Sequence, residues 1–204
     1  MTKHYSVSRQ ATEHKILLAV ADIIAEHGFE NIGVNMIAER AGIAKVLIYR
    51  YFGSLEQLIA HYIFKRDYWT SINVSASQID NLRSFLKNLF AQQINQLRDD
   101  IILKRLTRWE LSTHNQTMMQ IRQKREKNGC DLVELVSQLT QTTSHDVAAL
   151  ATILSSSISY LVMISEVSPC YNGIQLQTDE GWLQIKHGID MIIDLWLDHL
   201  KDIN

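Results

Sequence analysis

The chain has 204 residues, which is long enough for one or two compact domains. Hydrophobic residues make up 46% of the sequence and the formal net charge is only −2, which excludes intrinsic disorder for most of the chain. There is one proline and there are eight glycines, and because sheet-rich proteins use many such turn residues, the composition favours a helical protein.

The first fifty residues predict short helices separated by glycines. Residues 1–10 are polar and aperiodic, and they predict a flexible arm. From Thr12 onward apolar residues recur at helical spacing, and Gly28 is expected to end this first helix. The three helices expected in this head span residues 12–27, 34–41 and 44 or 45 to 52.

The sequence after Gly53 predicts longer helices. Ser54 followed by Gln57 three residues later is a capping-box signature, which marks the start of a helix. The helices expected from this point span residues 54–71, 79–98, 101–113, 115–141, 145–166 and 180–201. The longest connection, residues 167–179, holds the single proline. The chain is therefore predicted to be all-α with about nine helices, divided into residues 1–53 and residues 54–204.

Cysteine usage and targeting signals indicate a cytoplasmic protein. Cys130 and Cys170 are the only cysteines and show no disulfide-framework spacing, and no secretory signal peptide is recognisable. Residues 147–165 carry no charge and approach the length of a membrane span. This segment contains many serines and has acidic flanks, so it is expected to be a buried helix of a soluble bundle, and no membrane partner is expected.

Residues 34–52 have the proportions of a helix-turn-helix: two helices of about eight residues around a tight turn with Gly42. The face that would meet a DNA groove holds the donors Arg40, Lys45, Tyr49, Arg50 and Tyr51. Residues 1–60 contain six basic and six acidic residues, which is weak support for DNA binding, since affinity rests on phosphate neutralisation. Residues 40–53 nevertheless hold three cations and no acid, and the arm adds Lys3, His4 and Arg9. A solvated basic hairpin is the alternative interpretation.

Residues 16–59 resemble the amino-terminal DNA-binding domain of TetR-family transcriptional regulators. The residues that carry this resemblance are Ala21, Glu26, Gly28, Phe29, Ile37 to Lys45, Ile48 to Phe52, Ser54, Glu56 and Leu58. The resemblance implies a helix-turn-helix DNA-binding domain over residues 1–53 and a ligand-binding and dimerisation domain over residues 54–204. The DNA-binding residues that it implies are Gly33, Val34, Ala44, Lys45, Val46, Leu47, Tyr49, Arg50, Tyr51 and Ser54.

The chain departs from the family's usual pattern at several of these positions. Gly33 and Ala44 stand where hydroxyl residues are common, and a glycine usually occupies the position of Val46. These changes predict fewer phosphate contacts and a DNA site that is read partly by apolar contact from Val46 or Leu47 to thymine methyl groups. The amino ends of the helices near Val34 and Ser54 are expected to present N–H groups to phosphates.

The last two helices, residues 145–166 and 180–201, are expected to form a homodimer interface, as they do in the family. The apolar stripe that suggests this consists of Ile185, Ile189, Ile192, Trp196 and Leu200. Small residues for close helix approach are Ala148, Ala151, Ser155, Ser156 and Ser159. The row Asp190, Asp194, Asp198 and Asp202 is interpreted as a solvated face and not as a metal site.

Aromatic residues and methionines in the middle of the chain suggest an adaptable apolar pocket for an unidentified small molecule. The ligand-binding residues proposed from the sequence are Tyr62, Trp69, Phe90, Arg105, Trp109, His114, Met118 and Met119. Plain core packing is the alternative for each residue taken singly. Family resemblance favours a cavity lined by some subset of them.

No metal, cofactor or catalytic motif is recognisable. The eight histidines form no HxxxH or HExxH pattern, and no nucleophile elbow or phosphate-binding loop occurs, so the chain is not expected to be an enzyme. The sequence predicts a ligand-responsive repressor that binds a pseudo-palindromic operator on double-stranded DNA as a homodimer. An all-helical small-molecule-binding or scaffold protein without specific DNA binding is the alternative.

Overall fold

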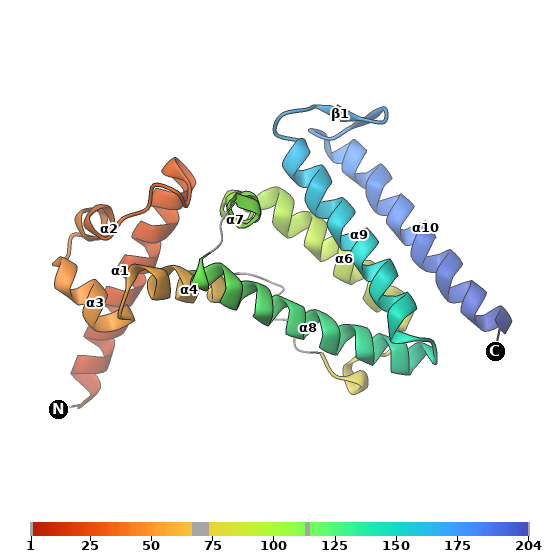
Figure 1. Ribbon diagram of the computed structural model, residues 1–204, viewed down its shortest axis with the longest axis horizontal. Coiled ribbons are helices and arrows are strands. Elements are labelled where there is room, and N and C mark those ends of the chain that lie inside the picture. The colour runs from red at the N-terminus through yellow and green to blue at the C-terminus, as the bar shows by residue number, and fades with distance from the viewer. Residues whose placement is uncertain (1, 67–73, 113–114, 204) are drawn as a thin grey trace. The chain divides into compact units, whose positions relative to one another are not determined.

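The computed structural model describes residues 2–66, 74–112 and 115–203. Across these ranges the chain forms nine α-helices, one short 3₁₀ helix and one two-stranded hairpin, which confirms the predicted all-α class and helix number (Figure 1).

The chain divides into two compact units, Met1–Ser71 with Ile101–Lys124 and Ile72–Asp100 with Arg125–Asn204. Each unit combines two separate stretches of sequence. The units therefore do not test the predicted functional boundary after residue 53, which stays a prediction.

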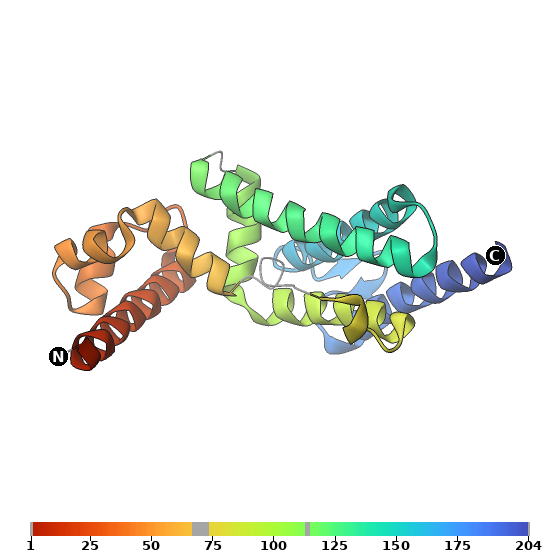
Figure 2. The same ribbon diagram turned by 90° about the horizontal axis from the view of Figure 1, so that it is seen from below.

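The first unit is built around one long helix. Its helices are α1 (Thr2–His27), α2 (Val34–Ala41), α3 (Lys45–Phe52), α4 (Leu55–Arg66), α7 (Ile101–Ser112) and the first part of α8 (Gln116–Thr140). Ile16, Val20, Ile23 and Ile24 of α1 are fully buried at helical spacing, and α2 and α3 lie close to α1 (Figure 2). The inward stripe of α1 therefore forms the core of this unit.

The amino-terminal arm predicted over residues 1–10 is wrong, because α1 already begins at Thr2. No proline or glycine lies between Thr2 and Gly28, so nothing in the sequence stops the helix from extending toward the amino terminus. The polar character of this stretch marks an extension of α1 that lacks the apolar stripe.

Glycines end the first three helices, as predicted. Gly28, Gly42 and Gly53 have φ values of +80°, +64° and +79°. At Gly42 the left-handed backbone lets its N–H donate to the carbonyls of Ala38 and Glu39, while the N–H of Ile43 donates to Ala38 at 3.0 Å. This arrangement closes α2 and turns the chain sharply into α3.

The second unit is a bundle in which α6 packs against two other helices (Figure 1). Its elements are the 3₁₀ helix η1 (Ala76–Gln78), α6 (Leu82–Asp99), the rest of α8, α9 (Ser144–Ile164), β1 (Cys170–Tyr171), β2 (Ile174–Gln175) and α10 (Asp179–Ile203). Its core joins apolar side chains of α6, α9 and α10, among them Leu86, Phe90, Ile94, Leu154, Ile158, Val162, Trp182, Ile189 and Ile193.

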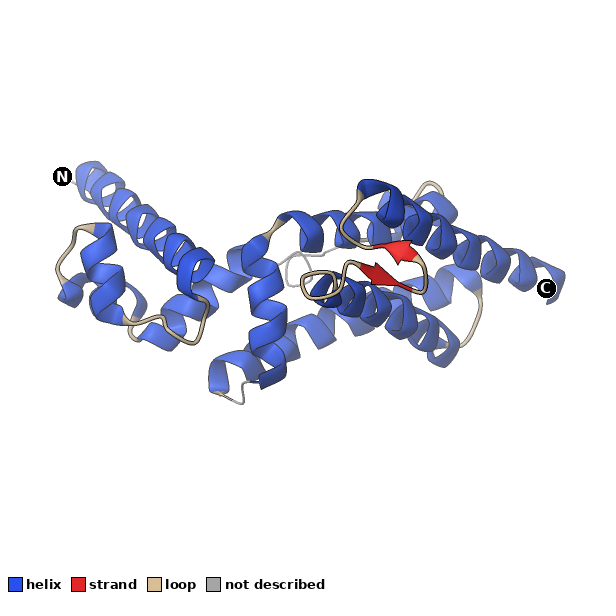
Figure 3. Ribbon diagram, turned by 90° about the horizontal axis from the view of Figure 1, so that it is seen from above, coloured by secondary structure: helices blue, strands red, loops and turns tan. Residues whose placement is uncertain are grey.

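A small hairpin replaces the loop predicted over residues 167–179 (Figure 3). Cys170 pairs with Gln175 in an antiparallel register, and Asn172 and Gly173 form the turn with φ values of 49° and 84°. Positive φ at both turn residues is the requirement of a type I′ turn, which Asn-Gly meets well. Strands of two residues are too short for an alternating pattern, so the sequence did not reveal them.

Helix α9 is the described helix that, by length and composition, could cross a membrane, yet only 22% of its most apolar window is buried. Val147, Leu154 and Ile158 face the bundle core, whereas Ile153 and Tyr160 are exposed. The prediction of a buried helix is therefore correct for one face only. The other face exposes apolar side chains to solvent.

Candidate nucleic-acid interface

Helix α3 is anchored by one side and presents the other to solvent. Ile48 is fully buried, while Val46 is 66% exposed and Tyr49 44% exposed. Lys45 and Arg50 are exposed on the same side as Val46 and Tyr49. Because residues 45, 46, 49 and 50 share one helix face, two cations, one aromatic ring and one apolar side chain point outward together.

The other predicted DNA-binding residues lie around this face. Leu47 and Tyr51 are half-buried on α3. Ala44 precedes α3 in an extended conformation, with φ −72° and ψ 133°, and it makes no side-chain cap bond within the described chain. The N–H of Leu47 donates to the carbonyl of Ala44 at 2.9 Å. The N–H groups that precede it at the start of such a helix have no intrahelical acceptor, so they can donate to a phosphate.

The helices before and after α3 begin differently: the start of α2 has no side-chain cap among the described residues, whereas the start of α4 has one. Gly33 precedes α2 with an extended backbone and no side-chain cap among the described residues, and Val34 is the first residue of α2. At α4 the Oγ of Ser54 accepts a hydrogen bond from the N–H of Gln57 at 3.2 Å, as the capping signature predicts. The hydroxyl of Ser54 therefore caps α4.

Three cations rest on two aromatic rings at this surface. The Nζ of Lys45 lies 6.0 Å from the centroid of the Tyr49 ring. The Cζ of Arg50 lies 5.8 Å from the centroid of Tyr51, and the Cζ of Arg9, from α1, lies 5.3 Å from it. These distances are typical of cation–π interactions, which restrict the positions of the long basic side chains.

Arg40 does not belong to the donor face predicted for it. Its guanidinium makes a two-pronged ion pair with Glu26 of α1, with Nη1–Oε1 at 2.9 Å and Nη2–Oε2 at 2.6 Å. The bond from Arg40 holds the pKa of the Glu26 carboxyl below its usual range. Arg40 therefore ties α2 to α1, a contact that depends on how the two helices cross.

The predicted ligand-binding residues are divided between the two units. Phe90 lies in the core of the second unit, whereas Tyr62, Arg105, Trp109, Met118 and Met119 belong to the first. Trp69 and His114 lie outside the described residues. Met118 is fully buried and Met119 is 55% exposed. A role in ligand binding stays a prediction for all of these residues.

Arg105 and Trp109 hold α7 against the carboxyl end of α1. The Nη1 of Arg105 donates to the carbonyl of Ile24 at 2.8 Å. The Trp109 ring stacks on Phe29 with the centroids 5.0 Å apart and 12° between the planes. Both contacts are structural links within the first unit.

One buried polar residue was not foreseen. Gln93 of α6 is 3% exposed, and its Nε2 donates to the carbonyl of Ser155 at 3.2 Å. Its Oε1 accepts no hydrogen bond from the residues that the structure describes. The signal in the sequence is a glutamine within the apolar stripe formed by Leu86, Phe90 and Ile94. A buried acceptor without a donor marks a place where a ligand or water can bond.

The exposed apolar face of the last two helices differs from the predicted stripe. Ile189 is buried, and Ile185 and Trp196 pack against the core, so the stripe is wrong at these three positions. Of the other two, Ile192 is 41% exposed and Leu200 is half-buried. The large apolar side chains that α9 and α10 do expose are Ile153, Tyr160, Leu183, Met191, Ile192 and Leu195. Helix α10 is apolar on more than one side, so its sequence alone does not select the core side.

The small residues predicted for close helix approach lie mostly at the edge of this face. Ser156 is exposed, while Ala148, Ala151, Ser155 and Ser159 are half-buried. The Oγ of Ser155 donates to the carbonyl of Ala151 at 2.7 Å, so it is bonded within its own helix.

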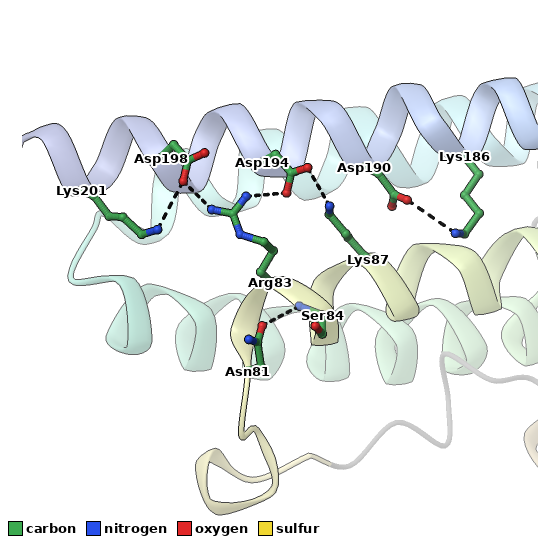
Figure 4. Close-up of polar contacts among 9 residues, drawn as sticks. All are labelled: Asn81, Arg83, Ser84, Lys87, Lys186, Asp190, Asp194, Asp198 and Lys201. Atoms are coloured by element: carbon green, nitrogen blue, oxygen red, sulfur yellow. Dashed lines mark hydrogen bonds and ion pairs between the residues drawn. The ribbon is translucent and has the colours of Figure 1, made fainter.

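The aspartate row of α10 is not simply a solvated face. Asp194 accepts from Arg83 at 2.5 Å and from Lys87 at 2.7 Å, and Asp198 accepts from Arg83 at 2.5 Å (Figure 4). Lys87 and Arg83 hold the pKa of Asp194 below its usual value. These pairs join α6 to α10. In the described part of the chain no three His, Cys, Asp or Glu side chains are grouped to hold a metal ion.

Comparison with known proteins places this head in a family. Residues 16–62 match the sequence model described as bacterial regulatory proteins, tetR family. A comparison with curated protein sequences gives no match.

Solved structures with a similar fold extend the likeness to most of the chain. A TetR family transcription regulator from Marinobacter aquaeolei VT8 is 21% identical, with a TM-score of 0.63, and the match covers 91% of this chain and 95% of that one. The fatty acid degradation regulator FadR from Bacillus halodurans is 21% identical, with a TM-score of 0.65, covering 91% and 94%. A transcriptional regulator from Rhodococcus sp. Rha1 is 19% identical, with a TM-score of 0.65, covering 92% and 96%.

Identities this low establish a shared fold, and the match over residues 16–62 establishes the kind of amino-terminal domain. That domain and that fold are those of DNA-binding transcription regulators. Residues 16–62 thus form the amino-terminal domain of the tetR family of bacterial regulatory proteins, and most of the chain shares its fold with solved regulators of that family.

Proposed function

We propose that this protein is a cytoplasmic, ligand-responsive repressor that binds a pseudo-palindromic operator as a homodimer. The observation that carries the proposal is the outer face of α3, where Lys45, Tyr49 and Arg50 are exposed around a buried Ile48. A helix of this length fits the major groove of B-DNA, and basic and aromatic donors are the groups that bind there.

The exposed residues suggest how the operator is read. Lys45 and Arg50 supply positive charge to phosphates or guanine edges, while the exposed Val46 suits thymine methyl groups. The starts of α2 and α3 offer backbone N–H groups in place of hydroxyl side chains, because Gly33 and Ala44 occupy the cap positions. We therefore expect recognition that combines few phosphate contacts with apolar base contacts.

Two copies of the chain would pair through the exposed faces of α9 and α10. Leu195 is 65% exposed, Leu183 is exposed to the same extent, and Ile153 of α9 is 64% exposed. Large apolar side chains that are exposed to solvent on a folded chain often mark a protein interface. A two-fold dimer would place its recognition helices about 34–36 Å apart, one turn of DNA, or somewhat more.

The effector is proposed to bind in the helical region after residue 53. In the second unit Phe90 offers an aromatic surface near the buried Oε1 of Gln93, one turn along α6. In the first unit the contacts of Arg105 and Trp109 join α7 to α1. An effector that favours a different position of α7 would strain this contact, and about 1–3 kcal/mol of coupling changes DNA affinity 5–150-fold.

DNA selection tests the operator proposal. Fragments enriched from random duplex by the purified protein define a site. Lys45→Ala and Tyr49→Ala are each expected to weaken binding to it by about 5- to 150-fold, which corresponds to one lost contact of about 1–3 kcal/mol. Lys124→Ala, which removes an exposed cation from α8, is the matched control and is expected to bind as the parent does. Equal affinity of all four proteins would refute the proposal.

Sedimentation tests the dimer. Leu195→Glu places a charge on the proposed interface and is expected to shift the protein toward monomer. Leu139→Glu changes an exposed leucine of α8 in the same way and is expected to leave the assembly unchanged. A parent protein that is monomeric at micromolar concentration contradicts the homodimer.

An all-helical small-molecule-binding or scaffold protein is the second candidate. The observation in its favour is the balance of six basic and six acidic residues over residues 1–60. Such a protein would show no preference for any duplex over random DNA at low salt.

Effector titration tests the coupling proposed for the regulator. A panel of small molecules is titrated against the operator complex, and a ligand that binds without changing DNA affinity argues against coupling.

A further inference from the structure

Helix α1 reaches beyond the part of the chain that matches the family. The family match begins at residue 16, whereas α1 begins at Thr2. Arg9 lies on this additional stretch, and its side chain is 60% exposed. The stretch therefore brings a basic residue that does not belong to the matched domain.

Arg9 reaches the recognition helix. Its guanidinium carbon lies 5.3 Å from the centroid of Tyr51, and the guanidinium carbon of Arg50 lies 5.8 Å from the same centroid. Two arginines from different helices, α1 and α3, thus share one aromatic ring. The ring fixes where both charges stand, which reduces the conformational entropy that each would lose on binding an anion.

The ion pair of Arg9 leaves it able to bind a further anion. Its Nε donates to the Oε1 of Glu13 at 2.8 Å, which uses one of the five N–H groups of a guanidinium. Arg50 carries a second guanidinium at the same ring. A phosphate accepts charge-assisted hydrogen bonds from a guanidinium, so the two arginines suit two successive phosphates of one strand.

We propose that Arg9 and Arg50 bind two neighbouring DNA backbone phosphates beside Tyr51, so that α1 forms part of the DNA interface. This inference rests on the proposed DNA-binding function. A phosphate contact carries no sequence information and instead sets the position of the recognition helix on the duplex. The loss of Arg9 is therefore expected to weaken binding equally on operator and on random duplex.

Salt dependence measures this contact directly. Each phosphate contact contributes about 0.9 to the slope of log affinity against log salt. Arg9→Ala is expected to lower the slope by about 0.9, so that its deficit relative to the parent differs about 3.5-fold between 50 and 200 mM salt. Arg9→Lys keeps the charge and is expected to keep the parent slope.

The full-length protein is used with two matched controls. Lys15→Ala removes an exposed cation from the same helix and is expected to leave the slope unchanged. Glu13→Gln removes the acid that is bonded to Arg9 and is expected to raise affinity for any duplex. Arg9 and Lys15 are exposed and Glu13 is half-buried, so these substitutions are expected to leave the fold intact. A thermal melt of each variant checks this.

Two results overturn the inference. An unchanged slope for Arg9→Ala, even with weaker binding, would mean that Arg9 only positions Tyr51. A parent that binds no duplex at low salt overturns the proposed function together with this inference, whereas a parent that binds its operator while Arg9→Ala keeps the full slope overturns this inference alone.

Discussion

Replacing Gln93 with leucine is expected to stabilise the protein. In the parent, Gln93 is 3% exposed and its Oε1 receives no hydrogen bond from the described residues. A buried acceptor without a donor costs about 1–3 kcal/mol, and leucine removes it at similar volume. The variant loses the bond from Nε2 to the carbonyl of Ser155, which contributes about 0.5–1.5 kcal/mol.

The balance of these two effects favours the variant. The Ser155 carbonyl keeps a bond from the Oγ of Ser159 at 3.0 Å, so the substitution creates no new unsatisfied group. We expect Gln93→Leu to raise the free energy of unfolding by about 1 kcal/mol, which corresponds to roughly 2–4 °C in Tm for a chain of this size. Urea denaturation at fixed protein concentration measures it, because dimerisation makes stability depend on concentration.

The matched control is Gln138→Leu, an exposed glutamine on the part of α8 that belongs to the second unit. It is expected to change stability by no more than about 0.5 kcal/mol. A loss of more than about 1 kcal/mol in Gln93→Leu would show that Oε1 is bonded in solution, and the reasoning would fail. A substitution that stabilises a protein can lower a function that needs the original residue. The leucine variant is accordingly expected to keep operator binding and to lose part of its effector response.

Four further substitutions test other parts of the fold. Gly42→Ala is expected to lower the free energy of unfolding by about 1–2 kcal/mol, because φ is +64° there. Gly129→Ala lies inside α8 with open space around a Cβ and should raise it by about 0.5–1 kcal/mol. Urea titrations that give both changes the same sign would contradict this. Trp109→Ala should cost about 3–5 kcal/mol by leaving a cavity beside Phe29, and a Tm equal to that of the parent would show that the stack contributes nothing. Arg83→Ala should lower Tm at pH 7, and this deficit should shrink as the pH falls below about 4. The pKa of Asp194 is lowered in the folded protein, so its carboxylate stabilises the fold above the unfolded-state pKa of about 4, and this stability is lost as the carboxylate takes up its proton. A deficit in Tm that is constant from pH 7 to 3 would refute the role of the ion pair.

Local sequence signals predicted most of the helices for a clear physical reason. Gly28 and Gly42 adopt positive φ where apolar periodicity breaks, so spacing and conformation agree. The start of α1 was missed because no residue before Thr12 blocks a helix and its polar surface carries no periodic stripe. The turn at Asn172 and Gly173 was visible in the sequence, but its strands are too short to show alternation.

Contacts between helices were less predictable than the faces of single helices. The outward face of α3 follows from the spacing of Lys45 and Tyr49 around Ile48. The pairing of Arg40 with Glu26 and the approach of Arg9 to the recognition helix depend on crossing angles, which local spacing does not encode.

The composition of α10 shows the same limit for burial. Ile189 and Leu195 both lie on apolar sides of this helix, and the position of α6 decides which one is buried. A hydrophobic residue on a helix that is apolar on several sides does not reveal by itself whether it faces the core of its own chain or a partner.

The docking of α7 on α1 bears on how the DNA-binding region can be isolated. A fragment that stops near residue 66 would keep all three helices of the head but lose the side chains of Arg105 and Trp109. Phe29 would then face water, and the last carbonyls of α1 would lose a charged donor. Such a fragment should expose apolar surface around Phe29 and aggregate. A fragment cut at the end of the family match is therefore expected to be less soluble than the intact chain.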